Sequence, residues 1–142
     1  MNLISGVKYL VDTNILVYSL NSNAPQYTRA KELLEAGFRD GVGFVVAHQN
    51  LMEFLAVLTR AYKIEVGQAM GDVEKFISCF EVIFPLSTTL GCFSELMTGS
   101  GKGVYPFDVY LAATMLDNGV ERIITANAKD FQGLGLEEVI TI

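Results

Sequence analysis

The sequence contains little that would support thiol or imidazole chemistry. Its 142 residues include two cysteines and one histidine. Cys79 and Cys92 lie in apolar segments and form no CxxC pair, so neither a zinc site nor a disulfide is indicated, and we expect both to be small buried residues. His48 lies at an expected strand–helix junction, and a hydrolytic relay built on a single histidine is poorly supported.

Long apolar runs are also missing. No stretch approaches the roughly 20 apolar residues that a membrane helix needs, and the N-terminus lacks the pattern of a secretory signal. We therefore expect a cytoplasmic protein with no membrane partner. Apolar residues make up 51% of the chain, enough for a sizeable core, and its length fits one domain at residues 1–142.

Positive charge is scarce. The chain has ten Lys and Arg residues and sixteen Asp and Glu residues, which gives a formal net charge of −6. Proteins that bind nucleic acid normally present a basic surface to the phosphates, and this composition does not suggest one. Two interpretations remain open: a solvated acidic surface that implies no partner, or clustered acids whose charge is neutralised by a metal ion.

What the chain does contain is an alternation of short strands and helices. The pattern predicts strands at 9–11, 43–48, 81–87, 122–126 and 137–142, and helices at 13–20, 26–37, 49–62, 66–80, 89–101 and 107–119. Gly37 and Gly119 are expected to end two of the helices, and Pro85 the third strand. This alternation indicates βαβ units and a mostly parallel sheet, with ligand sites beyond the carboxyl ends of the strands.

Four acids occupy positions from which they could meet at that edge. Asp12 follows the first expected strand, Asp108 begins a helix, and Asp130 comes shortly after the fourth strand. Glu53 lies inside LMEFLAVL, with no basic residue three or four positions away to pair with it. Each of the three aspartates also has an ordinary interpretation: Asp12 as a helix cap, Asp108 as a favourable charge in a first helical turn, and Asp130 as a turn residue.

Taken together, the four acids favour metal chemistry. Carboxylates placed within a few ångströms repel one another, which raises the pKa of at least one of them. A hard cation such as Mg²⁺ relieves that repulsion, since it prefers oxygen ligands and binds through carboxylates and a substrate phosphate. Such an ion activates water and stabilises charge on a phosphoryl oxygen, so the residues point to phosphodiester hydrolysis.

Four motifs, in order, match a known family. They are VDTNILVY (11–18), NLMEFLAVLTR (50–60), FDVYLAATMLDNGVERIIT (107–125) and ANAKDF (126–131). On these motifs the whole chain resembles a PIN-domain ribonuclease of the VapC type, the toxin half of bacterial and archaeal toxin–antitoxin pairs. The resemblance implies an α/β fold, a PIN-domain α/β/α sandwich with a mostly parallel sheet of about five strands.

The resemblance also implies a site for Mg²⁺ or Mn²⁺ and cleavage of RNA. Asp12 and Asp108 look like the main metal ligands, and Glu53 would complete the acidic pocket by binding metal through water or by orienting the attacking water. Many relatives carry the fourth acid at the position of Asn127, and here the nearest acid is Asp130. Whether Asn127 or Asp130 completes the site, and whether one or two metals bind, stays open.

Further residues take supporting roles by the same resemblance. Thr13 and Asn14 would orient Asp12, and Asn127 would line the pocket through hydrogen bonds. The candidates for contact with the RNA backbone are Arg60, Lys63, Lys102, Arg122 and Lys129. A VapC-like chain is also expected to form a homodimer and to be held inactive by a small antitoxin. The apolar stripes of helices 26–37 and 66–80 are candidates for the dimer face, although core packing explains such stripes equally well.

Two other known motifs are matched only in part, because residues that they require are missing. TGSGKGVYP (98–106) resembles a phosphate-binding loop, but Leu96 and Gly103 stand where that motif needs Gly and Ser or Thr. An aspartate-nucleophile phosphatase would need a second Asp at Asn14. The remaining alternative is a catalytically inactive PIN-fold scaffold that binds protein or RNA, which the acidic net charge favours and the four retained acids oppose.

Overall fold

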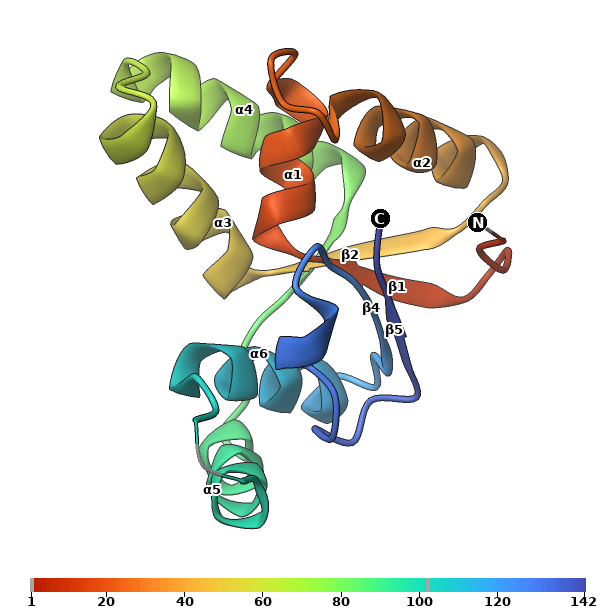
Figure 1. Cartoon of the computed structure of the whole chain (residues 1–142), viewed down its shortest axis with the longest axis vertical. Helices are drawn as coiled ribbons and strands as arrows, with labels where there is room; N and C mark the ends of the chain where they lie inside the picture. The colour runs from red at the N-terminus through yellow and green to blue at the C-terminus, as the bar shows by residue number, and fades with distance from the viewer. Residues whose placement is uncertain (1, 102) are drawn as a thin grey trace.

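A computed structural model describes residues 2–101 and 103–142 of the chain. Its centre is a five-stranded sheet between two layers of helices (Figure 1). The strands are β1 (Lys8–Val11), β2 (Gly43–Ala47), β3 (Glu81–Ile83), β4 (Arg122–Ile124) and β5 (Glu138–Ile140). They pair in parallel in the order β3-β2-β1-β4-β5, which confirms the expected α/β/α sandwich.

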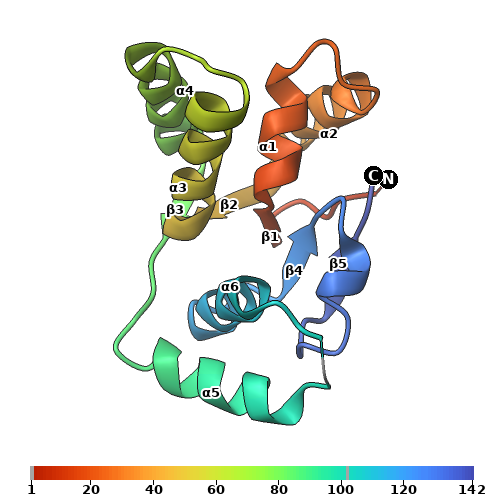
Figure 2. The same ribbon diagram turned by 60° about the vertical axis from the view of Figure 1, so that its left-hand side comes forward.

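Six α-helices cover the two faces of the sheet. They are α1 (Thr13–Leu20), α2 (Tyr27–Arg39), α3 (His48–Ala56), α4 (Val66–Cys79), α5 (Thr89–Gly99) and α6 (Pro106–Asp117). Helices α1 to α4 lie on one face, and α5 and α6 lie on the other (Figure 2). A π-helical turn, η1 (Val57–Ala61), continues α3, and a short 3₁₀ turn, η2 (Ala128–Asp130), follows β4. In the described part of the chain no helix is both long and apolar enough to cross a membrane.

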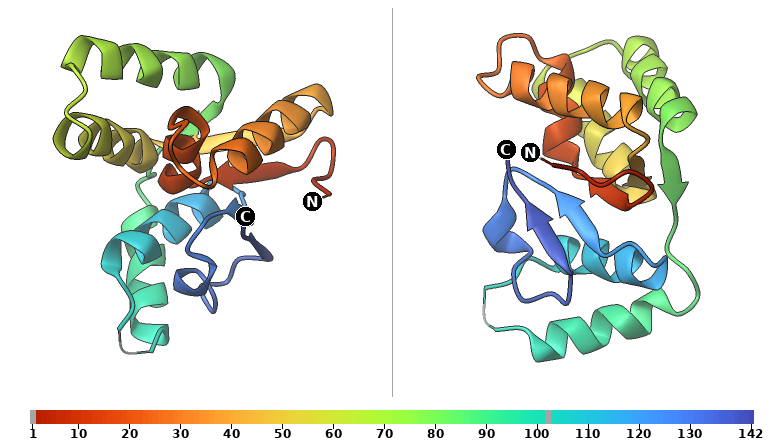
Figure 3. Two further views of the ribbon diagram at one scale, coloured as in Figure 1. Left: turned by 45° about the horizontal axis from the view of Figure 1, so that its top comes forward. Right: turned by 90° about the vertical axis from the view of Figure 1, so that its right-hand side faces the viewer.

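The central strands β1, β2 and β4 are largely buried on both faces, since successive side chains point to opposite sides of the sheet and helices cover each side. In β1, Tyr9 and Val11 join the apolar cluster under α1 to α4, whereas Leu10 joins the cluster under α5 and α6. In β4, Ile124 belongs to the cluster under α1 to α4, and Ile123 belongs to the cluster under α5 and α6. The two further directions of view in Figure 3 show these helical layers on either side of the sheet. Packing of helices on both faces therefore fixes the position of the sheet edge where the carboxyl ends of the strands lie.

Gly37 does not end its helix as expected. Helix α2 continues to Arg39, and the chain turns at Gly41, whose φ is +75°. Gly37 is buried against β2, where a Cβ atom would lie 2.2 Å from the Phe44 ring. The position needs glycine because the helix backbone approaches the sheet closely there.

Other differences from the expected elements are small. The third strand ends at Ile83, two residues before Pro85, and the fourth and fifth strands are three residues each. Gly119 has φ +71° and follows the end of α6, so the predicted stop there is confirmed. His48 is the first residue of α3, as expected of a helix start, and its ring packs against Phe84 with centroids 5.3 Å apart.

The expectation that both cysteines are buried is wrong. Cys79 is exposed at the end of α4, and Cys92 is half-buried on α5. Both residues belong to outer helices, where an apolar neighbourhood in sequence does not ensure burial. Both are free thiols.

Candidate active site

The candidate site lies at the carboxyl edge of three neighbouring strands. Asp12 directly follows β1, Thr125 directly follows β4, and Asn50 lies in the first turn of α3 after β2. Because β2, β1 and β4 are adjacent and parallel, these three side chains reach the same edge of the sheet.

Asp12 is buried and held from several elements. It is 7% exposed. Its Oδ2 accepts a hydrogen bond from the Thr125 hydroxyl at 2.7 Å, and its Oδ1 accepts one from the backbone N–H of Thr13 at 2.8 Å. The side-chain amides of Asn14 and Asn50 approach at 3.4 Å each. Asp12 is also the N-cap of α1, so the helix-cap interpretation is confirmed, and it is compatible with a second role as a ligand.

Burial raises the pKa of Asp12 above its ordinary value. The hydrogen bonds from Thr125 and from the backbone of Thr13 act in the opposite direction, and the nearby charge of Glu53 raises the pKa further. An ionised Asp12 is therefore unfavourable in isolation, and its partners compensate for only part of the cost.

Glu53 is oriented by uncharged groups. Its Oε2 accepts a hydrogen bond from the Thr13 hydroxyl at 2.9 Å, and its Oε1 accepts one from Gln49 Nε2 at 2.9 Å. The Thr13 hydroxyl in turn accepts from Asn50 Nδ2 at 3.2 Å. Thr13 thus contacts Asp12 through its backbone and Glu53 through its side chain, which links the two acids.

Gln49 connects α3 to the helix that carries Asp108. Besides its bond to Glu53, Gln49 Nε2 donates to the backbone oxygen of Phe107 at 2.9 Å. Gln49 Oε1 is buried and has no hydrogen-bond partner among the described residues. Gln49 was not predicted to take part in the site, although a glutamine four residues before a glutamate on a helix is in reach of it.

Asp108 lies in the first turn of α6, and the charges of the other three acids act on its carboxyl group. Its pKa is raised to about 6, mainly by burial, and further by the negative charges of Asp130, Asp12 and Glu53. All three therefore lie close enough for their charges to act on Asp108. Asp130 is exposed at the end of η2.

Asn14 and Asn127 lie where β4 leaves the sheet. Asn14 Oδ1 accepts from the backbone N–H of Ala126 at 3.1 Å, which ties α1 to this turn. Asn127 is exposed, and its backbone N–H, not its side chain, donates to Thr125 Oγ1 at 3.0 Å. The charge of Asp130 acts on Asp108, whereas the Asn127 side chain makes no bond among the described residues, and this favours Asp130 as the fourth acid.

Thr125 and Asn50 were not identified from the sequence. Thr125 is fully buried and ends the apolar run of β4, so a hydroxyl at the end of a central strand was the available signal. Asn50 is also fully buried, and its Oδ1 accepts from the backbone N–H of Ala47 at 2.9 Å. That local cap orients the amide so that its Nδ2 faces Thr13 and Asp12.

By their chemistry, the four acids are candidate ligands for a hard cation. None of the four acids forms an ion pair with a lysine or arginine within residues 2–101 and 103–142. In the same residues, no three His, Cys, Asp or Glu side chains stand in an arrangement that could hold a metal ion as placed. Repulsion between like charges keeps neighbouring carboxylates apart unless a cation lies between them. Four carboxylates that act on one another, with no protein cation, are the ligands that Mg²⁺ or Mn²⁺ prefers.

The cations expected to contact RNA differ in their surroundings. Arg122 pairs with Glu137 at 2.8 Å, so its guanidinium already has a partner. Arg60 and Lys129 are exposed, and no ion pair within the described chain involves them. Lys63 has an unusual φ of +57° in the turn after η1. Lys102 lies outside the residues that the structure describes.

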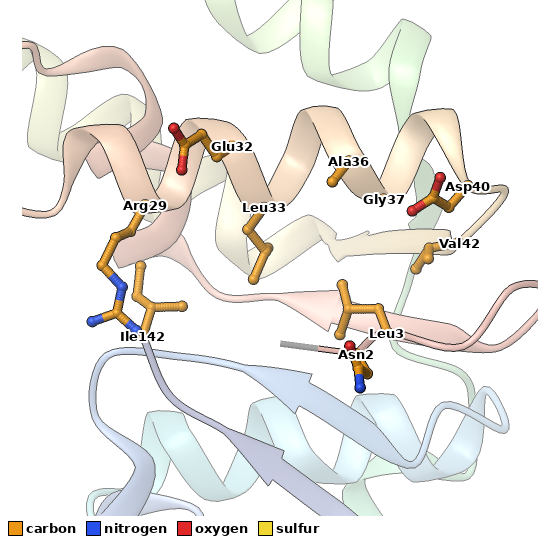
Figure 4. A pocket seen from close by; sticks show the side chains of 10 residues that line it. All are labelled: Asn2, Leu3, Arg29, Glu32, Leu33, Ala36, Gly37, Asp40, Val42 and Ile142. Carbon is orange, nitrogen blue, oxygen red and sulfur yellow. The ribbon is translucent and has the colours of Figure 1, made fainter.

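Two cavities in the described part of the chain lie away from the acids. One of about 540 Å³ is bounded by α2 and the chain ends, with Arg29, Leu33 and Ile142 in its wall (Figure 4). Another of about 350 Å³ lies between α1, η1 and α4. None of the four acids lines either cavity.

Comparison with known proteins agrees with this architecture. The family model described as PIN domain matches residues 9–135. Two toxin–antitoxin structures are similar in fold: VapBC2 from Rickettsia felis bound to a promoter DNA fragment (20% identity, 95% of this chain and 98% of that chain, TM-score 0.73) and a toxin–antitoxin complex from Klebsiella pneumoniae (25% identity, 88% and 91%, TM-score 0.63).

A third similar structure is Mycobacterium tuberculosis VapC20, described as a toxin that cleaves the sarcin–ricin loop (15% identity, 81% of this chain and 86% of that chain, TM-score 0.65). A search of curated proteins finds no relative by sequence. The family match spans every element of the sheet edge described above except β5, and includes all four acids. The chain therefore belongs to the PIN domain family.

Proposed function

We propose that this protein is an endoribonuclease that depends on Mg²⁺ or Mn²⁺ and hydrolyses RNA phosphodiester bonds. The observation that carries the proposal is the cluster of Asp12, Glu53, Asp108 and Asp130, whose mutual charge and burial raise the pKa of Asp108 to about 6. A folded protein retains such a repulsive arrangement at a cost. A divalent cation makes the arrangement favourable, and membership of the PIN family supports a hydrolase that acts on nucleic acid.

The residues divide into ligands and groups that hold them. Asp12 and Asp108 are the main ligands, with Asp130 and Glu53 completing the set. The ion, when bound, activates water and stabilises charge on the phosphoryl oxygen. Thr125 holds one oxygen of Asp12 at 2.7 Å, which fixes the direction of the carboxylate.

Glu53 is suited to orient the attacking water. Each of its oxygens already accepts one bond, from Thr13 and from Gln49, and a carboxylate oxygen has a second lone pair to offer. The exposed cations Arg60 and Lys129 are available for the RNA phosphates, and Lys129 adjoins Asp130 in the chain.

The partners follow from the similar structures. The Rickettsia and Klebsiella neighbours are toxin–antitoxin complexes. By this analogy we propose that the chain is the toxin component of such a pair. It would then work in the cytoplasm as a homodimer and be held inactive by a small antitoxin protein.

The direct test is cleavage of a labelled structured RNA by the purified protein with Mg²⁺, Mn²⁺ or EDTA. We expect cleavage that requires metal and is lost in Asp12→Asn, which keeps the size of the side chain and removes its charge. Asp40→Asn is the matched control, because Asp40 is an acid on the far end of α2. Cleavage that survives EDTA or the Asp12→Asn change would contradict the proposal.

One alternative is favoured by a specific observation. The net charge of −6 and the few free cations suit a PIN-fold scaffold that binds a protein or RNA without turnover. Such a scaffold would keep its binding partner in Asp12→Asn and would show no metal-dependent cleavage. The cleavage experiment therefore separates the two functions.

A further inference from the structure

Two aromatic side chains are exposed at the start of α6, the helix that carries Asp108. Tyr105 is 60% exposed and Phe107 is 57% exposed, and their rings lie with centroids 5.3 Å apart, tilted by 46°. By contrast, five phenylalanines are buried in the two apolar clusters: Phe44, Phe54, Phe76, Phe80 and Phe131. A pair of large apolar rings left in water is costly and often marks a binding surface.

The backbone that carries the two rings is held by hydrogen bonds. Pro106 lies between them as the first residue of α6, where its fixed φ suits the start of a helix. The backbone oxygen of Phe107 accepts a hydrogen bond from Gln49 Nε2 at 2.9 Å. The backbone oxygen of Tyr105 accepts from the N–H groups of Asp108 and Val109 at 3.0 and 3.2 Å. The backbone under the pair is therefore preorganised, and the two rings lie against each other, which reduces the conformational freedom lost when a ligand binds.

The position of the pair ties it to the proposed reaction. Phe107 directly precedes Asp108, and the Gln49 amide that holds the Phe107 backbone also holds Glu53. A phosphate bound at the four acids would therefore have a flanking nucleotide near the start of α6, the segment that carries the two rings.

The acidic net charge of the chain limits how strongly basic residues can bind RNA. Phosphate binding by basic residues is the usual source of affinity for nucleic acid. Here the chain is acidic overall, and five of its basic residues are already paired with acids: Lys8, Lys31, Arg39, Lys75 and Arg122. Stacking of bases on aromatic rings supplies affinity that does not depend on basic residues, and any base can take part.

We propose that Tyr105 and Phe107 form a stacking platform for an unpaired base of the RNA next to the scissile phosphate. This inference rests on the proposed nuclease function and narrows its substrate to single-stranded or looped-out RNA. The rings act on substrate binding and register, while the four acids carry the reaction.

The inference is tested by RNA binding in the Asp12→Asn background, where cleavage does not interfere. The probes are an unstructured 12-nucleotide RNA, the same RNA with one abasic position moved along it, and the corresponding duplex. Binding is measured by fluorescence anisotropy with Mg²⁺ present, for Tyr105→Ala, Phe107→Ala and Tyr105→Trp. Tyr62→Ala is the matched control, because Tyr62 is an exposed aromatic residue at the opposite end of the α3–η1 segment from the acids.

We expect Tyr105→Ala and Phe107→Ala each to weaken binding of the single strand about tenfold, with Tyr105→Trp close to the parent and Tyr62→Ala unchanged. One abasic position should weaken binding by the parent protein and cost much less in Tyr105→Ala, because the base has already lost its partner. Duplex RNA should bind weakly to all variants. An abasic penalty of equal size in the parent and in Tyr105→Ala would overturn the platform.

A second copy of the chain is the competing occupant of these rings. Sedimentation of the parent and of Tyr105→Ala at matched concentration decides between them, since loss of a dimer in the variant would overturn the proposal in favour of a protein interface. The two proposals can be rejected separately. If the wild-type protein shows no metal-dependent cleavage, both the nuclease function and the stacking platform are rejected. If the wild type cleaves RNA and Tyr105→Ala and Phe107→Ala cleave it equally well, only the platform is rejected.

Discussion

Asp12 illustrates how one residue serves the fold and the site together. Asp12 is the N-cap of α1, and its carboxylate also accepts a hydrogen bond from the hydroxyl of Thr125, which follows the neighbouring strand β4. From the sequence, a helix cap and a metal ligand look like alternative roles for Asp12. The cap uses only Oδ1, and Oδ2 accepts from Thr125, so capping by itself does not prevent Asp12 from binding a cation.

The raised pKa of Asp108 predicts how stability depends on pH. Its pKa is about 6, against an ordinary 3.8, so between these values the folded chain binds more protons at this residue than the unfolded chain does. The free energy of unfolding therefore falls as pH rises through that window, and the destabilisation is fully present above pH 6. Asp108→Asn should stabilise the metal-free protein at pH 7 by about 1 kcal/mol, after discounting for a half-buried group.

Urea unfolding in EDTA at pH 5 and pH 7 checks this prediction. The stability difference between Asp108→Asn and wild type should be larger at pH 7, while Asp40→Asn should show no comparable change with pH. A variant that is less stable than wild type at pH 7 would show that the four acids do not repel one another as the structure indicates.

Gln49 makes a second prediction at the residue scale. Its amide N–H groups bond Glu53 and the Phe107 backbone, and so set the position of α6 relative to α3. Gln49→Ala should lower the rate of RNA cleavage about 10- to 100-fold, since small errors in catalytic geometry are costly. Stability should fall by only about 1 kcal/mol, as expected for exposed or half-buried hydrogen bonds.

Single-turnover cleavage and urea unfolding measure these two effects for Gln49→Ala. Gln68→Ala, a glutamine on the outer helix α4, is the matched control and should leave the cleavage rate unchanged. Full activity in Gln49→Ala would mean that Glu53 and Asp108 keep their positions without this link.

At the scale of elements, most of the fold could be predicted from periodicity. Strand and helix order, the parallel sheet and the stop at Gly119 are all as expected. The role of Gly37 could not be predicted, because a glycine that ends a helix and a glycine that lets a helix approach a strand look alike in sequence. The distinction depends on Phe44, which is distant in the chain and lies across the interface.

Gly37 gives a prediction for the packing of α2 on β2. The Phe44 ring cannot move aside easily, because it is buried and packs against Phe38 and Phe80 at 5.2 and 6.1 Å. Gly37→Ala should therefore destabilise the protein by about 1–3 kcal/mol through overpacking. Gly71→Ala is the matched change on α4, where an added Cβ meets no atom within 4 Å, and it should stabilise by about 1 kcal/mol.

Thermal and urea unfolding of the two variants test this contrast. Opposite signs for Gly37→Ala and Gly71→Ala are the expected result. Destabilisation of equal size in both would mean that helix propensity or the unfolded state, and not the approach of α2 to Phe44, determines the outcome.

At the scale of the whole molecule, the acidic charge limits how RNA can bind. Two exposed cations without an ion pair in the described chain are Lys129, next to Asp130 in sequence, and Arg60, at the far end of the α3–η1 segment; phosphate contacts by both would give a slope of log K against log salt of about −1.4 for single-stranded RNA. Titrations of Asp12→Asn protein with RNA at several salt concentrations measure this slope, and Arg60→Ala with Lys129→Ala should bring it close to zero. A slope steeper than about −4 would require a basic surface of several phosphate contacts.

The site was predictable in outline and not in detail. The four acids were predicted because Glu53 has no local partner, the three aspartates follow expected strands or begin an expected helix, and together the four match a family pattern. Thr125, Asn50 and Gln49 were missed because an uncharged polar residue near a strand end has many ordinary roles. Only the three-dimensional arrangement shows that these residues hold Asp12, Glu53 and the start of α6 in one hydrogen-bonded network.

Calorimetric titration of Mn²⁺ into the purified protein tests most directly the claim that the four acids form one metal site. The account predicts saturable binding to wild type and to Asp40→Asn, and loss of that binding in Asp12→Asn and Asp108→Asn. Mn²⁺ binding of unchanged affinity in both site variants would contradict it, because the ion would then be held by residues other than the acids at the carboxyl edge of the sheet.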